Sequence, residues 1–267
     1  MKAILSLLSL LLGRTLAGEY LLPATPALQL FSDDILFYKS FDDASVAADM
    51  AVGQAKPSQV KGTLRLKPGL WGSAMLFGDG EGAELDFPMP ANMPVPRPGG
   101  LSFWISPFAW ERRADEPSVY FFLASGAGTL CLQRQGDLEG GKRRLNCFCF
   151  TCHGLPGIPN VSASTTSDAT RSWRNGEWHL VVINWRPSLL EAFIDGEPLP
   201  SMTLKRPIRM EEFARGGFRL GAVKGEPTLM DDFAVYRRPL SAAEVERLWA
   251  ARPVVRAARL TAPRRAG

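Results

Sequence analysis

The stretch GEWHLVVINWRPSLLEAFIDGEPL, residues 176–199, decides the fold. Residues 178–185 (WHLVVINW) are apolar at odd and even positions alike, which is typical of a strand buried on both faces in the middle of a sheet. Residues 190–195 form a second apolar run that leads into Asp195-Gly196, a turn signal between antiparallel strands. We expect His179, inside the first run, to be a packed and hydrogen-bonded core histidine rather than a catalytic base.

Similar signals recur along the rest of the chain. Alternating or apolar runs bounded by Gly- and Pro-rich turns predict further strands at 83–87, 101–106, 118–124, 129–133, 145–150, 218–222 and 229–236. Short strands at regular intervals without intervening helices predict an all-β, antiparallel two-sheet sandwich. Tryptophans inside these runs (Trp104, Trp178, Trp185) are expected to fill the core between the sheets.

One short helix is predicted near the C-terminal end of this region. Ser241-Ala242-Ala243-Glu244 is a capping box, in which the Ser and Glu side chains satisfy free backbone N–H groups. Val245, Leu248 and Trp249 follow at the spacing of one helix face. We expect this helix to dock on the sandwich.

The two ends of the chain differ from its body. Residues 1–17 have Lys2, an apolar run and a small residue at Ala17, which predicts a signal peptide and a secreted or periplasmic protein. Five arginines stand in the tail after residue 250, at positions 252, 256, 259, 264 and 265. Subtracting these five, Lys2 and Arg14 from the net charge of +4 leaves −3 for the body. The body therefore gives no reason to expect a nucleic-acid partner, and no later segment is apolar and long enough to span a membrane.

Three stretches resemble the laminin-G-like, concanavalin A-like lectin/glucanase jelly-roll family. They are GLWGSAMLFGDGEGAELDF followed by GGLSFWISPFAW, the hairpin quoted above, and LMDDFAVYRRPLSAAEVERLW. The resemblance implies a concanavalin A-like jelly roll with one C-terminal helix, and it divides the chain into a signal peptide (1–17), a lead-in (18–32), the laminin-G-like domain (33–250) and a flexible Arg-rich tail (251–267).

The resemblance also implies a function in binding. We expect an exported, non-catalytic module for a carbohydrate or an extracellular or cell-surface protein, with Trp110 and Trp173 as exposed aromatic contacts. Glucanases share the fold, so a glycoside hydrolase is an alternative. It is disfavoured because Glu84 and Asp86 lack the third acid of a catalytic E-x-D-x-E strand, and Asp231 and Asp232 should point to opposite faces.

Calcium is a ligand that this family often holds. Asp42 and Asp43 follow the first predicted strand, and Asp231 and Asp232 lie in the last one. If these strands are neighbours, their carboxylates can converge on a calcium ion, which prefers oxygen ligands. Solvated or hydrogen-bonded turn carboxylates are the alternative reading.

Four cysteines remain to be explained: Cys131, Cys147, Cys149 and Cys152. In an exported chain they favour two disulfides. If Cys131 lies opposite Cys147, Cys131 can form a disulfide with either Cys147 or Cys149. Cys152 would then pair with whichever of these two remains. A Cys/His zinc site is a second reading. A third is covalent haem, because Cys149, Cys152 and His153 form C-x-x-C-H; that protein would be a redox carrier. We expect no cofactor other than calcium.

Overall fold

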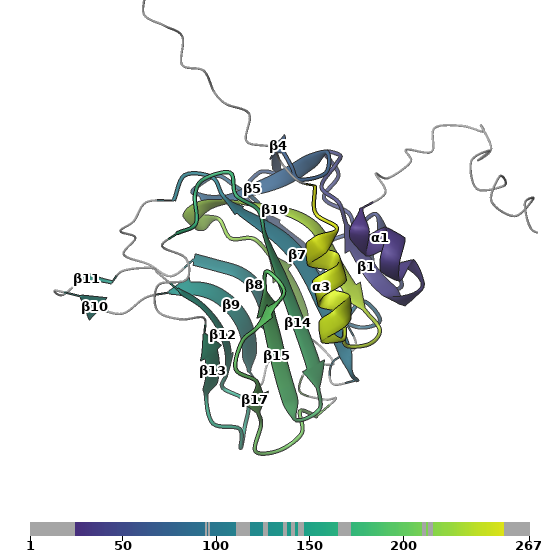
Figure 1. Cartoon of the computed structure of the whole chain (residues 1–267), viewed down its shortest axis with the longest axis vertical. Helices are drawn as coiled ribbons and strands as arrows, with labels where there is room; N and C mark the ends of the chain where they lie inside the picture. The colour runs from purple at the N-terminus through teal and green to yellow at the C-terminus, as the bar shows by residue number, and fades with distance from the viewer. Residues whose placement is uncertain are drawn as a thin grey trace, which may run out of the picture.

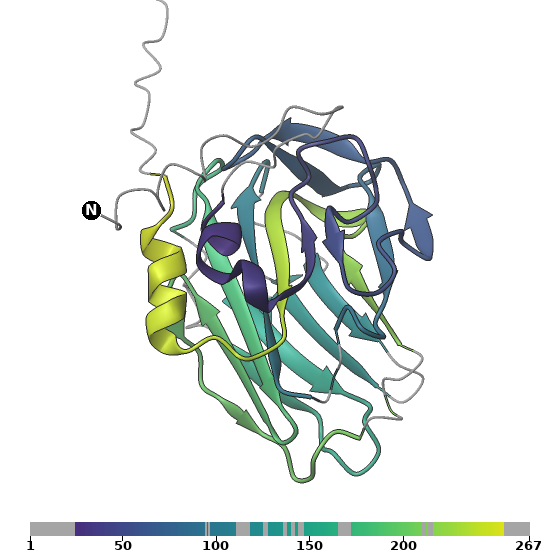
Figure 2. The same ribbon diagram turned by 90° about the vertical axis from the view of Figure 1, so that its right-hand side faces the viewer.

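The computed structural model describes residues 25–93, 95, 97–110, 118–124, 128–135, 138–139, 142–143, 147–164, 172–209, 212 and 216–253. Two antiparallel sheets face one another (Figures 1 and 2). The all-β jelly-roll prediction is therefore confirmed. Residues 1–24, which include the predicted signal peptide, and nearly all of the Arg-rich tail fall outside the described residues. No described helix is long and apolar enough to cross a membrane.

The larger sheet has the order β16-β15-β14-β7-β19-β1-β2, with β17 beside β15 and with β5 joining β4 to β19. Its strands are β1 (Ile35–Lys39), β2 (Met50–Ala51), β4 (Arg65–Pro68), β5 (Ser73–Asp79), β7 (Gly99–Pro107), β14 (His179–Arg186), β15 (Leu189–Ile194), β16 (Glu197–Pro198), β17 (Met202–Thr203) and β19 (Lys224–Tyr236).

The smaller sheet has the order β13-β12-β9-β8-β18-β6-β3. Its strands are β3 (Gln59–Lys61), β6 (Glu84–Pro88), β8 (Ser118–Ala124), β9 (Thr129–Gln135), β12 (Cys147–His153), β13 (Val161–Ser164) and β18 (Gly217–Leu220). A separate two-stranded hairpin joins β10 (Leu138–Glu139) to β11 (Lys142–Arg143) between β9 and β12.

The central strand β14 shows why residues 178–185 are apolar throughout. Val181, Ile183 and Trp185 face the main core between the two sheets. Leu180 and Val182 face a second core on the opposite side of the larger sheet. The strand pairs with β7 and β15, so both its edges are covered as well. Its central placement is confirmed.

Two helices cover the second core, α1 (Pro26–Phe31) and α3 (Ala242–Ala250), and both lie on the outer face of the larger sheet (Figure 2). Trp104 belongs to this second core and stacks on Trp249 of α3, with ring centroids 5.7 Å apart. The prediction that Trp104 lies between the sheets is thus wrong, because strand alternation turns it to the helix-covered face. Trp178 is only partly buried beside this core, and Trp185 lies between the sheets as predicted.

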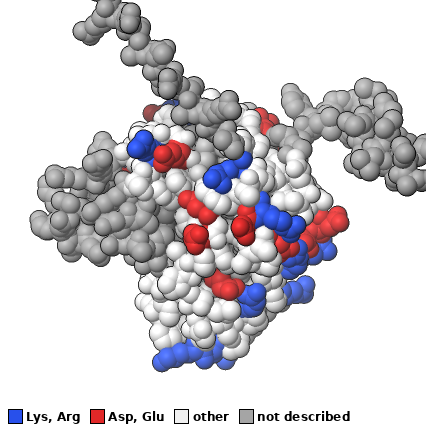
Figure 3. All heavy atoms as spheres, viewed as in Figure 1, with Lys and Arg blue, Asp and Glu red and all other residues white. Residues whose placement is uncertain are grey.

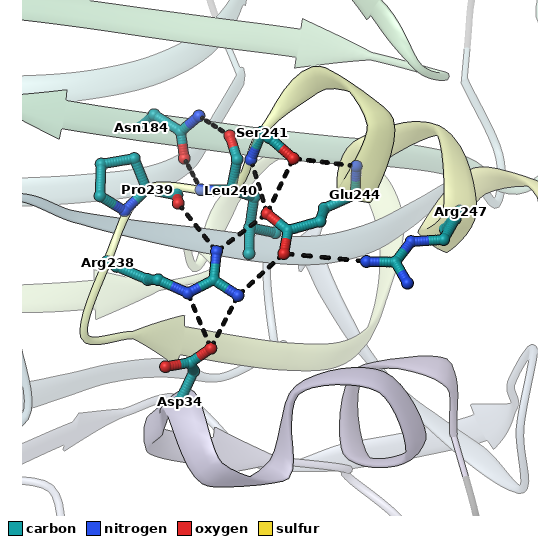
Figure 4. Close-up of polar contacts among 8 residues, drawn as sticks. All are labelled: Asp34, Asn184, Arg238, Pro239, Leu240, Ser241, Glu244 and Arg247. Atoms are coloured by element: carbon teal, nitrogen blue, oxygen red, sulfur yellow. Dashed lines mark hydrogen bonds and ion pairs between the residues drawn. The ribbon is translucent and has the colours of Figure 1, made fainter.

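The predicted capping box at the start of α3 is confirmed, and a polar network extends it (Figure 4). Arg238 places its guanidinium 2.8 Å from Asp34 Oδ2 and 2.8 Å from Glu244 Oε1. Asn184 of β14 donates to the carbonyl of Leu240 and accepts from its N–H. The network joins the start of α3 to the segment that precedes β1 and to the central strand.

Charged side chains of both signs are interspersed over the described atoms of the face seen in Figure 3. A surface that binds nucleic acid gathers basic side chains on one face or stripe. The mixed pattern agrees with the small net charge expected for the body of the chain.

Candidate functional site

The loops after β7 and before β14 carry three aromatic residues at the end of the sandwich where β7 ends and β14 begins, the upper end in Figure 1. Trp110 and Trp173 stack with ring centroids 5.9 Å apart and planes 13° apart. Phe108 is 42 % exposed beside them in the chain. Both tryptophans are partly buried against the main core. We call Phe108, Trp110 and Trp173 the aromatic end.

Hydrogen bonds hold the loops of the aromatic end together. The Trp110 N–H donates to Asn175 Oδ1 over 3.1 Å, and its indole N–H donates to Thr228 Oγ1 over 2.8 Å. The Gly176 N–H donates to the carbonyl of Pro107 over 2.8 Å. These bonds fix the Trp110 ring in place, so little side-chain entropy is lost when a ligand contacts it.

His179, the first residue of β14, lies under Trp173. The two rings are 3.3 Å apart between centroids and nearly parallel, at 4°. The imidazole Nδ1 is 2.7 Å from Asp195 Oδ2, and the other oxygen of Asp195 accepts from the Leu180 N–H. The expectation of a packed, hydrogen-bonded histidine is confirmed, since His179 is only 8 % exposed.

The Asp195-Gly196 turn explains how this carboxylate reaches β14. Both residues have positive φ, 56° and 89°, as a type I′ hairpin turn requires, and Ile194 pairs with Glu197 across it. The sequence signal for the turn is therefore confirmed between β15 and β16. The turn returns the Asp195 side chain to the start of β14.

Phe108 was missed by reasoning from the sequence. It follows a strand and stands two residues before Trp110, but an isolated exposed phenylalanine has no sequence signature. The structure places the Lys67 ammonium of β4 5.7 Å from the centre of its ring. The aromatic end thus also presents one positive charge.

The acidic residues predicted to bind calcium are brought partly together. Asp42 accepts from the Ser73 N–H, and Asp231 accepts from the N–H groups of Leu70 and Trp71, so both carboxylates bind the same turn before β5. Asp43 instead pairs with the buried Lys39 ammonium. Among the described residues, no three His, Cys, Asp or Glu side chains are grouped to hold a metal ion. Calcium binding stays a prediction.

Asp231 and Asp232 do not alternate as predicted. A register shift between Asp231 and Ala234 and a φ of +54° at Asp232 form a bulge in β19. Both carboxylates are buried, and Asp232 accepts a hydrogen bond from the Tyr38 hydroxyl. Burial raises the pKa of Asp232 to about 6, and burial together with the Asp232 charge raises the pKa of Asp231 well above its ordinary value.

The cysteine prediction needs a correction. Cys131 lies opposite Thr151 rather than Cys147, which pairs with Gln135, and Cys152 lies opposite Leu130. Cys131 and Cys152 are free and buried, so neither forms the disulfide we expected. They lie on neighbouring strands one register position apart, so their side chains point to opposite faces of the smaller sheet: Cys152 belongs to the main core, and Cys131 contacts the Thr151 hydroxyl. The side chains of Cys147 and Cys149 lie outside the described part.

The C-x-x-C-H alternative does not suit this strand. Positions 149 and 152 are three apart on β12, and strand residues three apart lie on opposite faces. Cys152 is 1 % exposed among side chains of the main core, where a porphyrin has no room, whereas His153 is exposed. One haem cannot take both thiols and His153 from this arrangement without unfolding the strand.

The two acids of β6 are ion-paired. Glu84 lies 2.6 Å from the Lys61 ammonium and 3.2 Å from Arg219, and Asp86 lies 2.8 Å from the same guanidinium. A glycosidase needs one carboxylate free to attack and another free to donate a proton. Because Glu84 and Asp86 are held by Arg219 and Lys61, the arrangement favours a structural role for these two acids over a catalytic one.

Residues 79–246 match the concanavalin A-like lectin/glucanases superfamily. The chain belongs to this superfamily. The match runs from the end of β5 into α3, and so includes the aromatic end, His179 and Asp195. No curated protein matches the chain significantly by sequence.

Several solved structures share this fold. Domain 4 of AbnA, a GH43 extracellular arabinanase from Geobacillus stearothermophilus, in complex with arabinotriose, is 18 % identical with a TM-score of 0.59; the alignment covers 80 % of this chain and 98 % of that domain. The botulinum neurotoxin serotype D binding domain is 11 % identical with a TM-score of 0.62, over 82 % of this chain and 52 % of that one.

A further similar structure is the botulinum neurotoxin DC binding domain in complex with rat synaptotagmin II. It is 12 % identical with a TM-score of 0.62, over 84 % of this chain and 53 % of that one. The chain thus spans about half the length of the neurotoxin binding domains that it matches. At these identities the likeness establishes the fold.

Proposed function

We propose that the protein is an exported, non-catalytic carbohydrate-binding module whose ligand stacks on the aromatic end. The single observation that carries this is the stack of Trp110 on Trp173 on adjoining loops at one end of a lectin-like sandwich, with the exposed Phe108 two residues before Trp110 in the chain. Aromatic rings present an apolar face to the C–H groups of a sugar, and nearby polar atoms orient its hydroxyls. The similar arabinanase domain was solved with arabinotriose, which supports a sugar rather than a protein as the ligand.

Binding without catalysis is supported by the acids of the smaller sheet. Glu84 and Asp86 share Arg219. The neighbouring acids Asp231 and Asp232 are buried and accept hydrogen bonds from backbone N–H groups and from the Tyr38 hydroxyl. Export is supported by the leader at residues 1–17, and its test is the mass of the protein recovered outside the cytoplasm.

The test of binding is a panel of immobilised oligosaccharides that includes arabinotriose and sialylated sugars. We expect the wild-type protein to retain at least one of them. Trp110→Ala and Phe108→Ala should bind it at least 10-fold more weakly, a loss of about 1.4 kcal/mol per tenfold change. Val52→Ala, which truncates an apolar side chain that is 62 % exposed elsewhere, is the matched control and should bind normally.

Retention of no sugar by a correctly folded wild-type protein refutes the proposal. Equal binding by the wild type and both aromatic variants places any sugar site elsewhere. Release of shorter sugars from a bound oligosaccharide, followed by chromatography, would instead favour the hydrolase alternative.

A further inference from the structure

His179 carries a buried polar atom that the fold does not use. Its Nδ1 is engaged by Asp195, whereas Nε2 is buried and has no hydrogen-bond partner in the described part of the chain. An unpaired buried polar atom costs about 1–3 kcal/mol, so native proteins rarely keep one without a reason. The position of this atom, under the aromatic end, suggests the reason.

Asp195 decides the chemistry of that atom. Its carboxylate also accepts from the Leu180 N–H, so its orientation is fixed by the backbone of the neighbouring strand. A carboxylate can only accept, so the imidazole must donate through Nδ1–H. In the neutral ring this leaves the Nε2 lone pair free to accept a hydrogen bond.

We infer that His179 Nε2 accepts a hydrogen bond from a hydroxyl group of the sugar bound at the aromatic end, and that His179 is therefore a specificity-determining residue. This inference rests on the proposed function. A sugar supplies the two kinds of contact that this end offers, C–H groups for the rings and O–H donors for Nε2. A site built around a buried acceptor discriminates against a ligand that lacks the matching hydroxyl.

Trp173 packs on the ring that carries this acceptor. Its indole covers one face of the imidazole at 3.3 Å, whereas the Nε2 lone pair lies in the plane of the ring, and Nε2 is buried. A hydroxyl therefore reaches Nε2 along the ring edge, and only when the side chains around the Trp173–His179 stack shift. Ligand binding should therefore change the fluorescence of Trp173 as the stack opens. The Trp110 ring, held by Thr228 and Asn175, remains as the fixed contact.

The experiment compares His179→Phe with His153→Phe on the oligosaccharide panel. His179→Phe keeps a flat ring under Trp173 but removes Nε2, and we expect at least 10-fold weaker binding of the retained sugar. His153 is the only other histidine and is exposed on β12, so His153→Phe is a matched control and should bind as the wild type does. Equal binding by His179→Phe overturns the inference while leaving the proposed function intact.

A second measurement keeps the test decisive if His179→Phe does not fold. In the wild type labelled with ¹⁵N-histidine, saturation with the retained sugar should move the Nε2 resonance of His179 and leave that of His153 in place. An unmoved His179 resonance overturns the inference. If the folded wild type retains no sugar at all, the proposed function fails first and the inference fails with it.

Discussion

Replacement of Asp232 by asparagine removes a carboxylate that is 1 % exposed and lies beside Asp231 in the bulge of β19. Asparagine keeps an oxygen that can accept from the Tyr38 hydroxyl, but it carries no charge. Burial raises the pKa of Asp232 from 3.8 to about 6. A shift of about 2 units corresponds to about 3 kcal/mol of difference between the two protonation states.

The direction in which stability changes with pH follows from proton binding. Between pH 4 and 6 the folded protein holds a proton on Asp232 that the unfolded chain has already lost, so the free energy of unfolding falls as the pH rises through this window. Asp231 and Asp42, whose pKa values are also raised by burial, act in the same direction. The wild type should be more stable at pH 5 than at pH 7.5, by about 1.4 kcal/mol from Asp232 alone, because only about one pH unit of the shift lies above pH 5.

The assay is urea unfolding followed by tryptophan fluorescence at both pH values. Asp232→Asn should raise the free energy of unfolding at pH 7.5 and flatten its pH dependence, whereas Asp33→Asn, at an exposed carboxylate before β1, should change neither. A wild type that is more stable at pH 7.5, together with a destabilised Asp232→Asn variant, refutes the reasoning. If removal of calcium with EDTA destabilises the wild type, these acids bind a cation instead.

Three further predictions follow from the packing. Glu244→Gln keeps an oxygen that can complete the capping box but removes the charge that pairs with Arg238, and should cost about 1 kcal/mol at pH 7. Because the Arg238 hydrogen bond lowers the pKa of Glu244 to about 2, the wild type should lose this advantage as the pH falls from 4.5 towards 2. Equal urea midpoints at pH 7 would contradict the network. Cys131 and Cys152 are free and buried, and burial raises the pKa of Cys152 to about 11. Iodoacetamide should therefore label both thiols in urea but not in the folded protein, and no reductant should be needed, as read by peptide mass. Labelling that requires a reductant would show a disulfide. Gly78→Ala should lower the urea midpoint, because the φ of Gly78 is +83° and a Cβ would meet the Glu226 carbonyl oxygen at 2.4 Å. Unchanged stability would show that the end of β5 can shift.

Much of the fold could be predicted because burial leaves a periodic mark. The apolar run of β14 indicated a central strand, since both of its faces pack against cores. The Ser241–Glu244 box marked the start of α3. The role of Trp104 was missed because a sequence cannot tell which of two apolar faces looks toward the other sheet and which looks toward a helix.

The errors at the sites have local causes. The β9–β12 register depends on the length of the intervening turn, where a further hairpin, β10–β11, intervenes, and no property of the thiols reports it. The bulge at Asp232 interrupts alternation through one residue with positive φ, which an Asp-Asp pair does not signal. The stack of Trp173 on His179 joins a loop to a strand start and is decided by tertiary packing alone.

The most direct test of the account is to locate the bound sugar by NMR through the indole N–H resonances of the seven tryptophans. With a sugar retained on the panel, the account predicts that the Trp110 and Trp173 resonances shift on titration, while those of Trp104 and Trp185, buried in the two cores, stay in place. Shifts confined to other tryptophans, or a saturating sugar that moves neither Trp110 nor Trp173, would contradict it.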